Sequence, residues 1–242
     1  MRVDSTRLAE VPEGATARSV FEGDAGPGWS VFVNGSLLEM PPRAYELSPG
    51  DRVQWDRPPA AAAGAPTRAI VGAFPEPFLH GFQGERRPVR VECDDADADS
   101  CRSAKQTLED ADVPTTGSSL GAPGTEHVTR LVVARWPAAK IVRGGFTLEQ
   151  GPAANGVYAR FAKNGKELEL LDAEGEVARA VRPGDGTALI VALRPRAEEL
   201  LWLVTALDDA GLEAGVRALR PRALKDAYAV AVTNTTVEKL PL

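Results

Sequence analysis

Histidine, cysteine and aromatic residues are scarce in this chain. Its 242 residues include two histidines, two cysteines and 6% aromatic side chains. Neither His80 nor His127 has another metal-ligand type at a recognised spacing, so we expect no metal and no cofactor. Glycine-rich phosphate loops of the G-x-x-x-x-G-K and G-x-G-x-x-G kinds are also missing, which leaves nucleotide binding without support.

Positive charge is not in excess either. The formal net charge is −6, the isoelectric point is near 5.2, and Lys and Arg are scattered, so neither a nucleic-acid partner nor a basic membrane patch is expected. The longest apolar run, Leu200 to Leu207, is far too short to span a bilayer. The first residues lack the layout of a secretion signal, which taken alone favours the cytoplasm; a trimmed mature chain is the alternative.

The pattern of apolar residues and turns predicts an α+β fold with two domains. Residues 1–58 form a small, mostly antiparallel domain, the Pro- and Ala-rich stretch 59–67 a linker, and residues 68–242 an α/β domain. In the small domain, Asn34-Gly35 is a strong hairpin signal because both residues accept positive φ. Expected strands are Trp29–Val33, Ser36–Leu38, Tyr45–Leu47 and Val53–Trp55, with a turn at Ser48–Asp51.

Strands and helices alternate in the second domain. Strand–helix–strand units predict a mixed sheet with parallel pairs. The expected strands are Ala69–Val71, Val89–Glu92, Val128–Ala134, Thr187–Leu193, Leu200–Thr205 and Tyr228–Val232, and a second Asn-Gly hairpin spans Tyr158–Leu171. The expected helices are Ser100–Asp112 and a second that follows a cap at Asp208 and stops at Pro221.

Three aromatic residues, Phe74, Phe78 and Phe82, fall in a stretch that its prolines keep from being helical. Such a loop either covers a core or lines a groove, and covering a core is the commoner case.

Two short motifs could carry chemistry. Gly117-Ser118-Ser119-Leu120-Gly121 matches the G-x-S-x-G pattern of a nucleophile elbow, but no strand is expected before it and no helix after it, so we interpret it as a flexible loop. Asp95, Asp97 and Asp99 alternate as in a calcium loop, but Ser100 and Gln106 stand where that loop needs Gly and Glu. A solvated acidic loop is the expected structure, and an enzyme such as a hydrolase is the least favoured class.

Cys93 and Cys101 flank this acidic loop. Their spacing is not C-x-x-C, which argues against a zinc knuckle or a thioredoxin-type pair. By spacing alone, a disulfide and two free thiols are equally compatible with the sequence. A disulfide would indicate an oxidising compartment.

The first quarter of the chain resembles the transcobalamin/intrinsic-factor C-terminal-like domain family. The pattern G-W-x-x-x-V-N-G begins at Gly28, and Y-x-L-x-P-G-D-x-V-x-W runs from Tyr45 to Trp55. The resemblance departs in one place, since we expect the helix usual between Gly14 and Gly28 in that family to be truncated here. The remainder is similar to the second, uncharacterised domain of actinobacterial exported proteins that carry this module.

The resemblance implies a small β-grasp-like domain and an exported chain, secreted or lipid-anchored, which favours the Cys93–Cys101 disulfide. It implies cobalamin or a related small molecule as ligand, with a helical-barrel or transporter protein as partner. We expect a ligand at Val33, Asn34, Gly35 and Trp55, although filling a small core is the alternative role of the tryptophans. A cell-envelope protein-interaction module, with Phe74, Phe78 and Phe82 as contact surface, is the alternative function.

Overall fold

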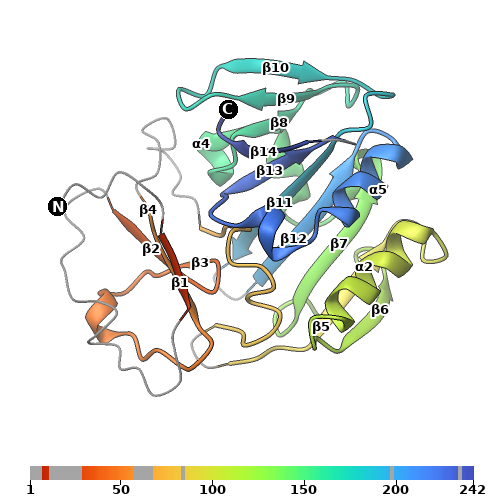
Figure 1. Ribbon diagram of the computed structural model, residues 1–242. Coiled ribbons are helices and arrows are strands. Elements are labelled where there is room, and N and C mark those ends of the chain that lie inside the picture. Colours follow the sequence, from red (N-terminus) through yellow and green to blue (C-terminus); the bar gives the residue numbers. More distant parts are fainter. Residues whose placement is uncertain (1–6, 11–28, 57–67, 83–84, 197–198, 234–235) are drawn as a thin grey trace.

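A computed structural model of the chain describes residues 7–10, 29–56, 68–82, 85–196, 199–233 and 236–242 (Figure 1). Three sheets account for most of the secondary structure, and one of them is mixed. About 20% of the chain is helix and 35% is strand, which confirms the α+β class. The predicted linker and the truncated helix between Gly14 and Gly28 lie outside the described residues, and the domain boundaries stay predictions.

A small antiparallel sheet forms from the first part of the chain. Across the sheet the strands are β1 (Arg7–Glu10), β4 (Arg52–Asp56), β2 (Ser30–Val33) and β3 (Ser36–Leu37). The predicted hairpin is confirmed, since Asn34 and Gly35 both have positive φ, at 50° and 77°. The turn at Ser48–Asp51 is also confirmed, with the Asp51 amide donating to the Ser48 carbonyl at 3.1 Å.

Two predicted strands in this region are wrong. Tyr45–Leu47 follows a short 3₁₀ helix, η1 (Pro42–Ala44), as extended chain outside any sheet. The alternation of apolar and polar residues in this segment has a different origin: Tyr45 and Leu47 are buried in the core of the small sheet although the segment pairs with no strand of the described residues. Ala69–Val71 contributes only an isolated bridge, between Ala69 and Ser36.

The second part of the chain builds a seven-stranded mixed sheet. Across the sheet the strands are β14 (Val237–Leu240), β13 (Ala229–Val232), β11 (Ala188–Arg196), β12 (Glu199–Ala206), β7 (Thr129–Arg135), β5 (Val89–Cys93) and β6 (Thr115–Ser119). The four strands β12, β7, β5 and β6 pair in parallel, and the remaining pairs are antiparallel. The predicted mixed sheet is therefore present.

The two strand–helix–strand units differ in their geometry. In the first, β5 and β6 are parallel neighbours joined through helix α2 (Asp99–Glu109). In the second, α5 (Asp209–Arg217) connects β12 to β13, but β11 lies between these two strands. Pairing with β11 is antiparallel on both sides, which makes this half of the sheet mixed.

Both faces of the mixed sheet are covered (Figure 1). Helices α2 and α5 cover one face, where Leu108 and Leu212 pack with Trp202. The other face carries the three-stranded antiparallel sheet and short helices, with Trp136 stacked on Phe161 at 3.8 Å between ring centroids. These elements are β10 (Val177–Val181), β9 (Leu168–Leu171), β8 (Ala159–Phe161), α3 (Trp136–Ala139), η3 (Gly145–Glu149) and α4 (Pro152–Asn155). The short helix α6 (Pro221–Leu224) belongs to the face of α2 and α5, where Leu224 joins their core. No helix within these described ranges is long and apolar enough to cross a bilayer.

Strands β1, β6, β10 and β14 are absent from the sequence prediction. All four lie at sheet edges. β10 and β14 are mostly exposed, and β6 has the composition Thr-Thr-Gly-Ser-Ser. Edge strands need little apolar surface because they bury fewer side chains, so a search for apolar periodicity misses them. The expectation of a flexible loop at Gly117–Gly121 is wrong for the first three residues, which belong to β6.

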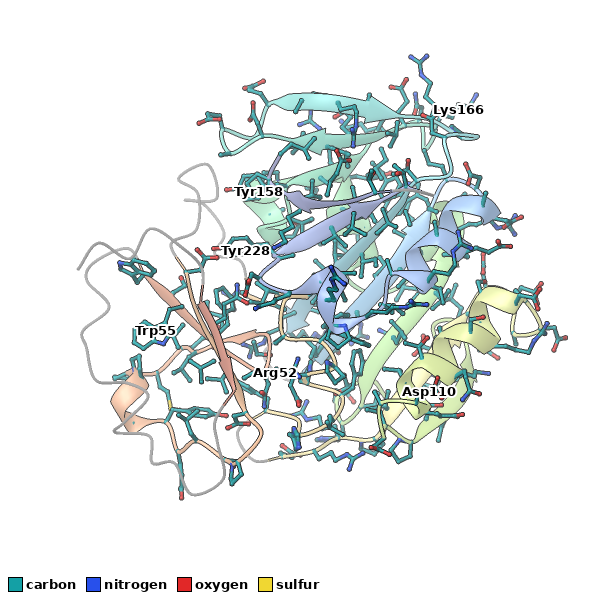
Figure 2. The ribbon with its side chains drawn as sticks, in the orientation of Figure 1. Arg52, Trp55, Asp110, Tyr158, Lys166 and Tyr228 are labelled. Carbon is teal, nitrogen blue, oxygen red and sulfur yellow. A yellow bond between two sulfur atoms is a disulfide. The ribbon has the colours of Figure 1, made fainter. Side chains whose placement is uncertain are left out.

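The small sheet docks on the larger unit through its more polar face. Arg52 donates to the Phe74 carbonyl at 2.5 Å, and Phe32 meets Tyr228 edge to face at 6.2 Å between centroids. Gln54, on the same face as Arg52, lies against Gly72. Figure 2 shows Arg52 between the two units and Trp55 on the outer part of the small sheet.

Candidate functional site

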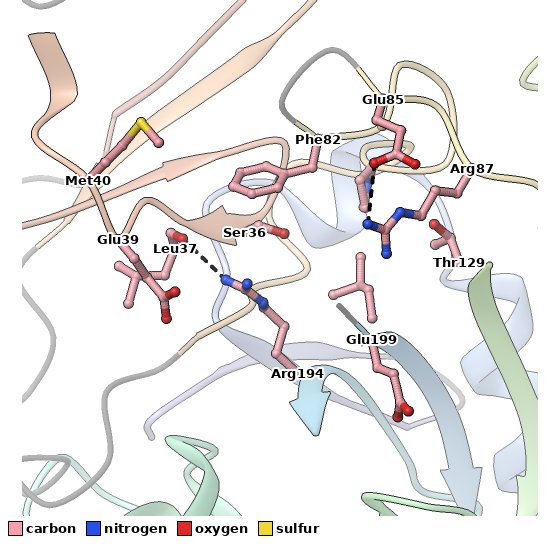
Figure 3. Close-up of a pocket in the computed structure, with 13 residues that line it drawn as sticks. Ser36, Leu37, Glu39, Met40, Phe82, Glu85, Arg87, Thr129, Arg194 and Glu199 are labelled. Atoms are coloured by element: carbon pink, nitrogen blue, oxygen red, sulfur yellow. Dashed lines mark hydrogen bonds and ion pairs between the residues drawn. The ribbon is translucent and has the colours of Figure 1, made fainter. Parts of the chain in front are cut away.

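A cleft of about 340 Å³ lies where the small sheet meets one edge of the mixed sheet (Figure 3). β3 and the chain after it form one wall, and a second wall is formed by Pro77, Gly81, Phe82, Glu85 and Arg87. The third wall is the end of β11 together with the first residues of β7 and β12. The side chains that matter below are Ser36, Phe82, Arg87, Thr129, Arg194 and Glu199.

The cleft lies at the amino ends of the parallel strands, because β5, β7 and β12 all begin beside it. Open parallel sheets usually bind ligands at the opposite edge. At that opposite edge lie the start of α5, the turn at Gly184 and a disulfide. Asp208 caps α5 by accepting from the Gly211 amide at 2.7 Å, which confirms the predicted cap, and its other carboxylate oxygen accepts from the Gly184 amide at 2.6 Å. The disulfide between Cys93 and Cys101 ties the end of β5 to α2.

The hairpin tip, where a ligand was expected, is buried. Val33 is 0% and Asn34 1% exposed. The Asn34 side-chain amide donates to Asp51 Oδ1 at 2.7 Å and to the Gly81 carbonyl at 2.8 Å, and its Oδ1 accepts from the Arg52 amide at 2.8 Å. A ligand contact at Val33 or Asn34 is therefore not supported. The side chain of Asn34 instead joins the β2–β3 turn to the start of β4 and to the chain at Gly81 by hydrogen bonds.

Gly35 is equally inaccessible. A Cβ on this residue would lie 2.7 Å from the Ile70 carbonyl oxygen. The Gly35 carbonyl accepts from the Ile70 amide at 2.8 Å, so the chain beyond the predicted linker closes directly over the turn. Only glycine allows this approach, which corrects the expectation that Gly35 meets a ligand.

Trp55 packs against the core of the small sheet, as the alternative reading of its role anticipated. It is half-buried beside the apolar cluster of Val31, Val33 and Val53. It does not line the cleft.

Of the three aromatic residues expected to form a contact surface, two are core residues. Phe74 and Phe78 are 2% and 0% exposed and pack on Trp202 at 5.8 and 5.0 Å between ring centroids. Their burial corrects that expectation and confirms the commoner reading of the segment as a core cover. Phe82 alone reaches the cleft, where its ring lies 6.0 Å from that of Tyr45.

Two guanidinium groups approach the cleft from opposite sides (Figure 3). Arg194, from the end of β11, donates to the Leu37 carbonyl at 3.4 Å and lies 5.9 Å from the centroid of Phe82. Arg87, just before β5, pairs with Glu85 at 3.4 Å. The hydroxyl residues Ser36 and Thr129 also line the cleft.

Glu199 is the most buried charged residue of the cleft lining, with 3% of its side chain exposed. Its Oε1 accepts from Arg143 at 2.8 Å and from the Thr125 hydroxyl at 3.1 Å. Its Oε2 is buried and has no hydrogen-bond partner among the described residues. A buried carboxylate oxygen of this kind has unused capacity to accept a hydrogen bond.

This arrangement suits a polar ligand. Guanidinium and hydroxyl groups donate to carboxylate, phosphate or amide oxygens, and Glu199, Glu39 and Glu85 accept from amines, amides or hydroxyls. Phe82 adds one aromatic face. None of these lining residues was among the ligand contacts expected from the sequence, although Phe82 and the start of β3 lie within the two segments that were singled out.

His80 pairs with Glu76 beside the cleft. The His80 Nδ1 lies 2.5 Å from Glu76 Oε1, and the side chain of Glu76 is 1% exposed. Burial raises the pKa of Glu76, and hydrogen bonds with His80 and the charges of His80 and Arg52 offset part of this effect. The imidazole ring also covers Gly50, whose Cβ would lie 2.7 Å from it. These contacts fit the structural role expected for His80.

The acidic loop Asp95–Asp99 has local partners. The Asp97 amide donates to Asp95 Oδ1 at 2.9 Å, and Arg102 contacts Asp99. Within the described ranges, no group of three or more His, Cys, Asp or Glu side chains is arranged to hold a metal.

The Cys93–Cys101 pair is a disulfide in the structure. The spacing alone left free thiols open, and the resemblance favoured the bond. The disulfide prediction is confirmed.

Comparison with known proteins finds no matching protein family and no matching curated protein. The resemblance of the first quarter of the chain to the transcobalamin/intrinsic-factor C-terminal-like domains therefore stays a prediction.

Proposed function

We propose that this protein is an extracytoplasmic binding protein, not an enzyme, and that the cleft between its two units holds a small polar ligand. The observation that carries the proposal is the convergence of Arg87, Arg194, Ser36 and Phe82 from both units on one cavity. Small-molecule sites favour such junctions between units, with a few polar groups that fix orientation. The disulfide supports an oxidising compartment, in a chain that is secreted or lipid-anchored at the cell surface.

The ligand that the sequence resemblance suggests is cobalamin or a related small molecule, captured with a helical-barrel or transporter partner. Ligand pockets commonly measure about 300–1,000 Å³, and the cleft, at about 340 Å³, is at the lower end. A corrinoid would therefore place only one edge or side arm in the cleft, and the partner would cover the rest. The amide side arms of a corrinoid match the donors and acceptors of the lining.

Calorimetric and absorbance titration with cobalamin tests this proposal, first with the chain alone and then with a helical-barrel partner. Phe82→Ala should weaken binding by about tenfold, since it removes the aromatic face of the cleft. Trp55→Ala, outside the cleft, is the matched control and should leave affinity unchanged. If cobalamin fails to bind at high micromolar concentration under both conditions, the corrinoid part of the proposal is wrong; if Trp55→Ala alone weakens binding, the ligand lies on the small sheet and the cleft is the wrong site.

A cell-envelope protein-interaction module remains the second candidate. Burial of Phe74 and Phe78 removes most of the surface proposed for it. The exposed edge strand β6 still offers backbone groups for pairing with a partner strand.

A further inference from the structure

A second pocket, next to the cleft, gathers four arginines. Its volume is about 540 Å³, and Arg68, Arg143, Arg194 and Arg196 line it. We call it the arginine pocket. Among the described residues that line it there is no Asp or Glu, although the whole chain carries a net charge of −6. Positive charge is thus concentrated locally in an acidic protein.

The four arginines come from three separate segments. Arg68 precedes the bridge to β3, Arg143 lies in the turn before η3, and Arg194 and Arg196 end β11. The pairing register between β11 and β12 shifts between Leu193 and Arg196, which is typical of a β-bulge. Bulges bend a strand and redirect its side chains, and they recur beside binding sites.

The walls of the pocket are held by close packing. A Cβ on Gly144, which has φ of +92°, would lie 2.4 Å from the ring of Pro195, so the turn carrying Arg143 rests directly on the end of β11. On the other side, the Asn155 side chain donates to the Thr147 carbonyl at 2.8 Å and accepts from the Val157 amide at 2.7 Å. Close packing and side-chain hydrogen bonds therefore hold two of the pocket walls.

Two of the arginines have carboxylate partners at the rim. Arg68 pairs with Glu39 at 3.1 Å and Arg143 with Glu199 at 2.8 Å. A guanidinium has five N–H donors, so Arg68 and Arg143 can keep these partners and still donate into the pocket.

We propose that the arginine pocket binds a phosphate group. Arginine forks match phosphate oxygens through paired hydrogen bonds, and four guanidinium groups line this one pocket. The phosphate belongs either to a free phosphorylated solute or to a lipid head group. Two exposed apolar side chains lie near the pocket and would insert into a lipid surface: Phe146, 50% exposed, and Ile141, 80% exposed and two residues before Arg143. Replacing Phe146 should therefore weaken binding to a lipid head group but not to a free solute.

The test begins with pyrophosphate titration by calorimetry at low salt. Arg196→Gln and Arg68→Gln each remove an exposed guanidinium that lines this pocket and not the cleft. Each should weaken binding by about tenfold. Arg222→Gln, at an exposed position of α6, is the matched control and should bind like the wild type, with circular dichroism confirming that every variant folds.

Co-sedimentation with phosphatidylglycerol vesicles, and with phosphatidylcholine vesicles as the uncharged comparison, identifies the source. Binding to phosphatidylglycerol that Arg196→Gln and Phe146→Ala both reduce indicates a lipid head group. Pyrophosphate binding that Phe146→Ala leaves intact, without vesicle binding, indicates a free solute. The proposal is overturned if neither probe binds, or if Arg222→Gln weakens binding as much as Arg196→Gln. Arg196 does not line the cleft, so the result for Arg196→Gln is independent of the cobalamin titration; Arg68 pairs with Glu39 of the cleft, so Arg68→Gln supports that result but does not replace it.

Discussion

Replacing Asn34 with alanine should destabilise the small sheet and its docking on the larger unit. Three hydrogen bonds from this buried side chain would be lost, with donor–acceptor distances of 2.7–2.8 Å to Asp51, the Gly81 carbonyl and the Arg52 amide. Leaving buried groups unpaired costs about 1–3 kcal/mol each. Asn34 also has φ of 50°, a conformation that costs alanine about 1 kcal/mol more. Since the partners relax in part, we expect a loss of about 3–5 kcal/mol in total.

Urea unfolding followed by tryptophan fluorescence measures this loss, because Trp55 lies in the small sheet and Trp202 in the larger unit. Asn34→Gly is the matched control: it removes the same hydrogen bonds but accepts positive φ, so it should recover about 1 kcal/mol relative to Asn34→Ala. The reasoning fails if Asn34→Gly is as stable as the wild type, since the hydrogen bonds would then contribute nothing. It also fails if glycine and alanine give equal stability, because backbone conformation would then be irrelevant.

Three further predictions follow from buried groups. Removing the disulfide with Cys101→Ala should lower the free energy of unfolding by about 2–3 kcal/mol, given its sequence separation of 8. In urea unfolding, a reducing agent should lower the midpoint of the wild type but leave unchanged that of a double variant that carries both Cys93→Ala and Cys101→Ala. Burial opposes ionisation of Glu92, but Arg130 at 2.7 Å, the Gly121 amide and Arg90 outweigh it and hold the pKa of Glu92 below its usual 4.5. The stability that this ion pair contributes is therefore present above pH 4.5 and lost as the pH falls further, and Glu92→Gln should flatten the dependence of the free energy of unfolding on pH in this acidic range. Trp202→Ala should cost about 3–5 kcal/mol in a chemical denaturation experiment, because Trp202 is 0% exposed, and a change below 1 kcal/mol would contradict its place at the centre of the core.

Local signals predicted much of the fold. The Asn34-Gly35 turn, the cap at Asp208 and the buried strands at Val89 and Leu200 all depend on short-range chemistry that neighbouring residues specify. These features formed as expected because propensity and burial agree at each position.

Other features depend on what lies next to a segment in space. Tyr45 and Leu47 alternate in burial, yet no strand runs beside them, so an alternating pattern alone was insufficient. β6 forms with almost no apolar surface because β5 supplies its hydrogen bonds. Neither outcome can be read from the segment itself.

The candidate site was the least predictable part. Scattered arginines gave no sign of a basic patch, since Arg68, Arg143 and Arg194 meet only when three distant segments pack together. The ligand residues expected at the hairpin tip are buried because the segment after the predicted linker returns to cover them. One local signal was available: Arg194-Pro195-Arg196 places proline within a strand, which is typical of a bulge or an edge.

Two of the three Asn-Gly pairs in this sequence, Asn34-Gly35 and Asn164-Gly165, should age differently. Asparagine before glycine is prone to lose its side-chain amide, because the following backbone nitrogen can attack the carbonyl carbon and form a succinimide. That attack needs a side-chain amide that is not held by hydrogen bonds and a backbone that can rotate. Asn34 meets neither condition, because its side-chain nitrogen donates to Asp51 and to the Gly81 carbonyl and the residue is buried. Asn164 lies exposed in the loop between β8 and β9. Stored protein should therefore accumulate aspartate and isoaspartate at Asn164 long before Asn34, and peptide mapping of an aged sample would report how firmly the small sheet stays docked.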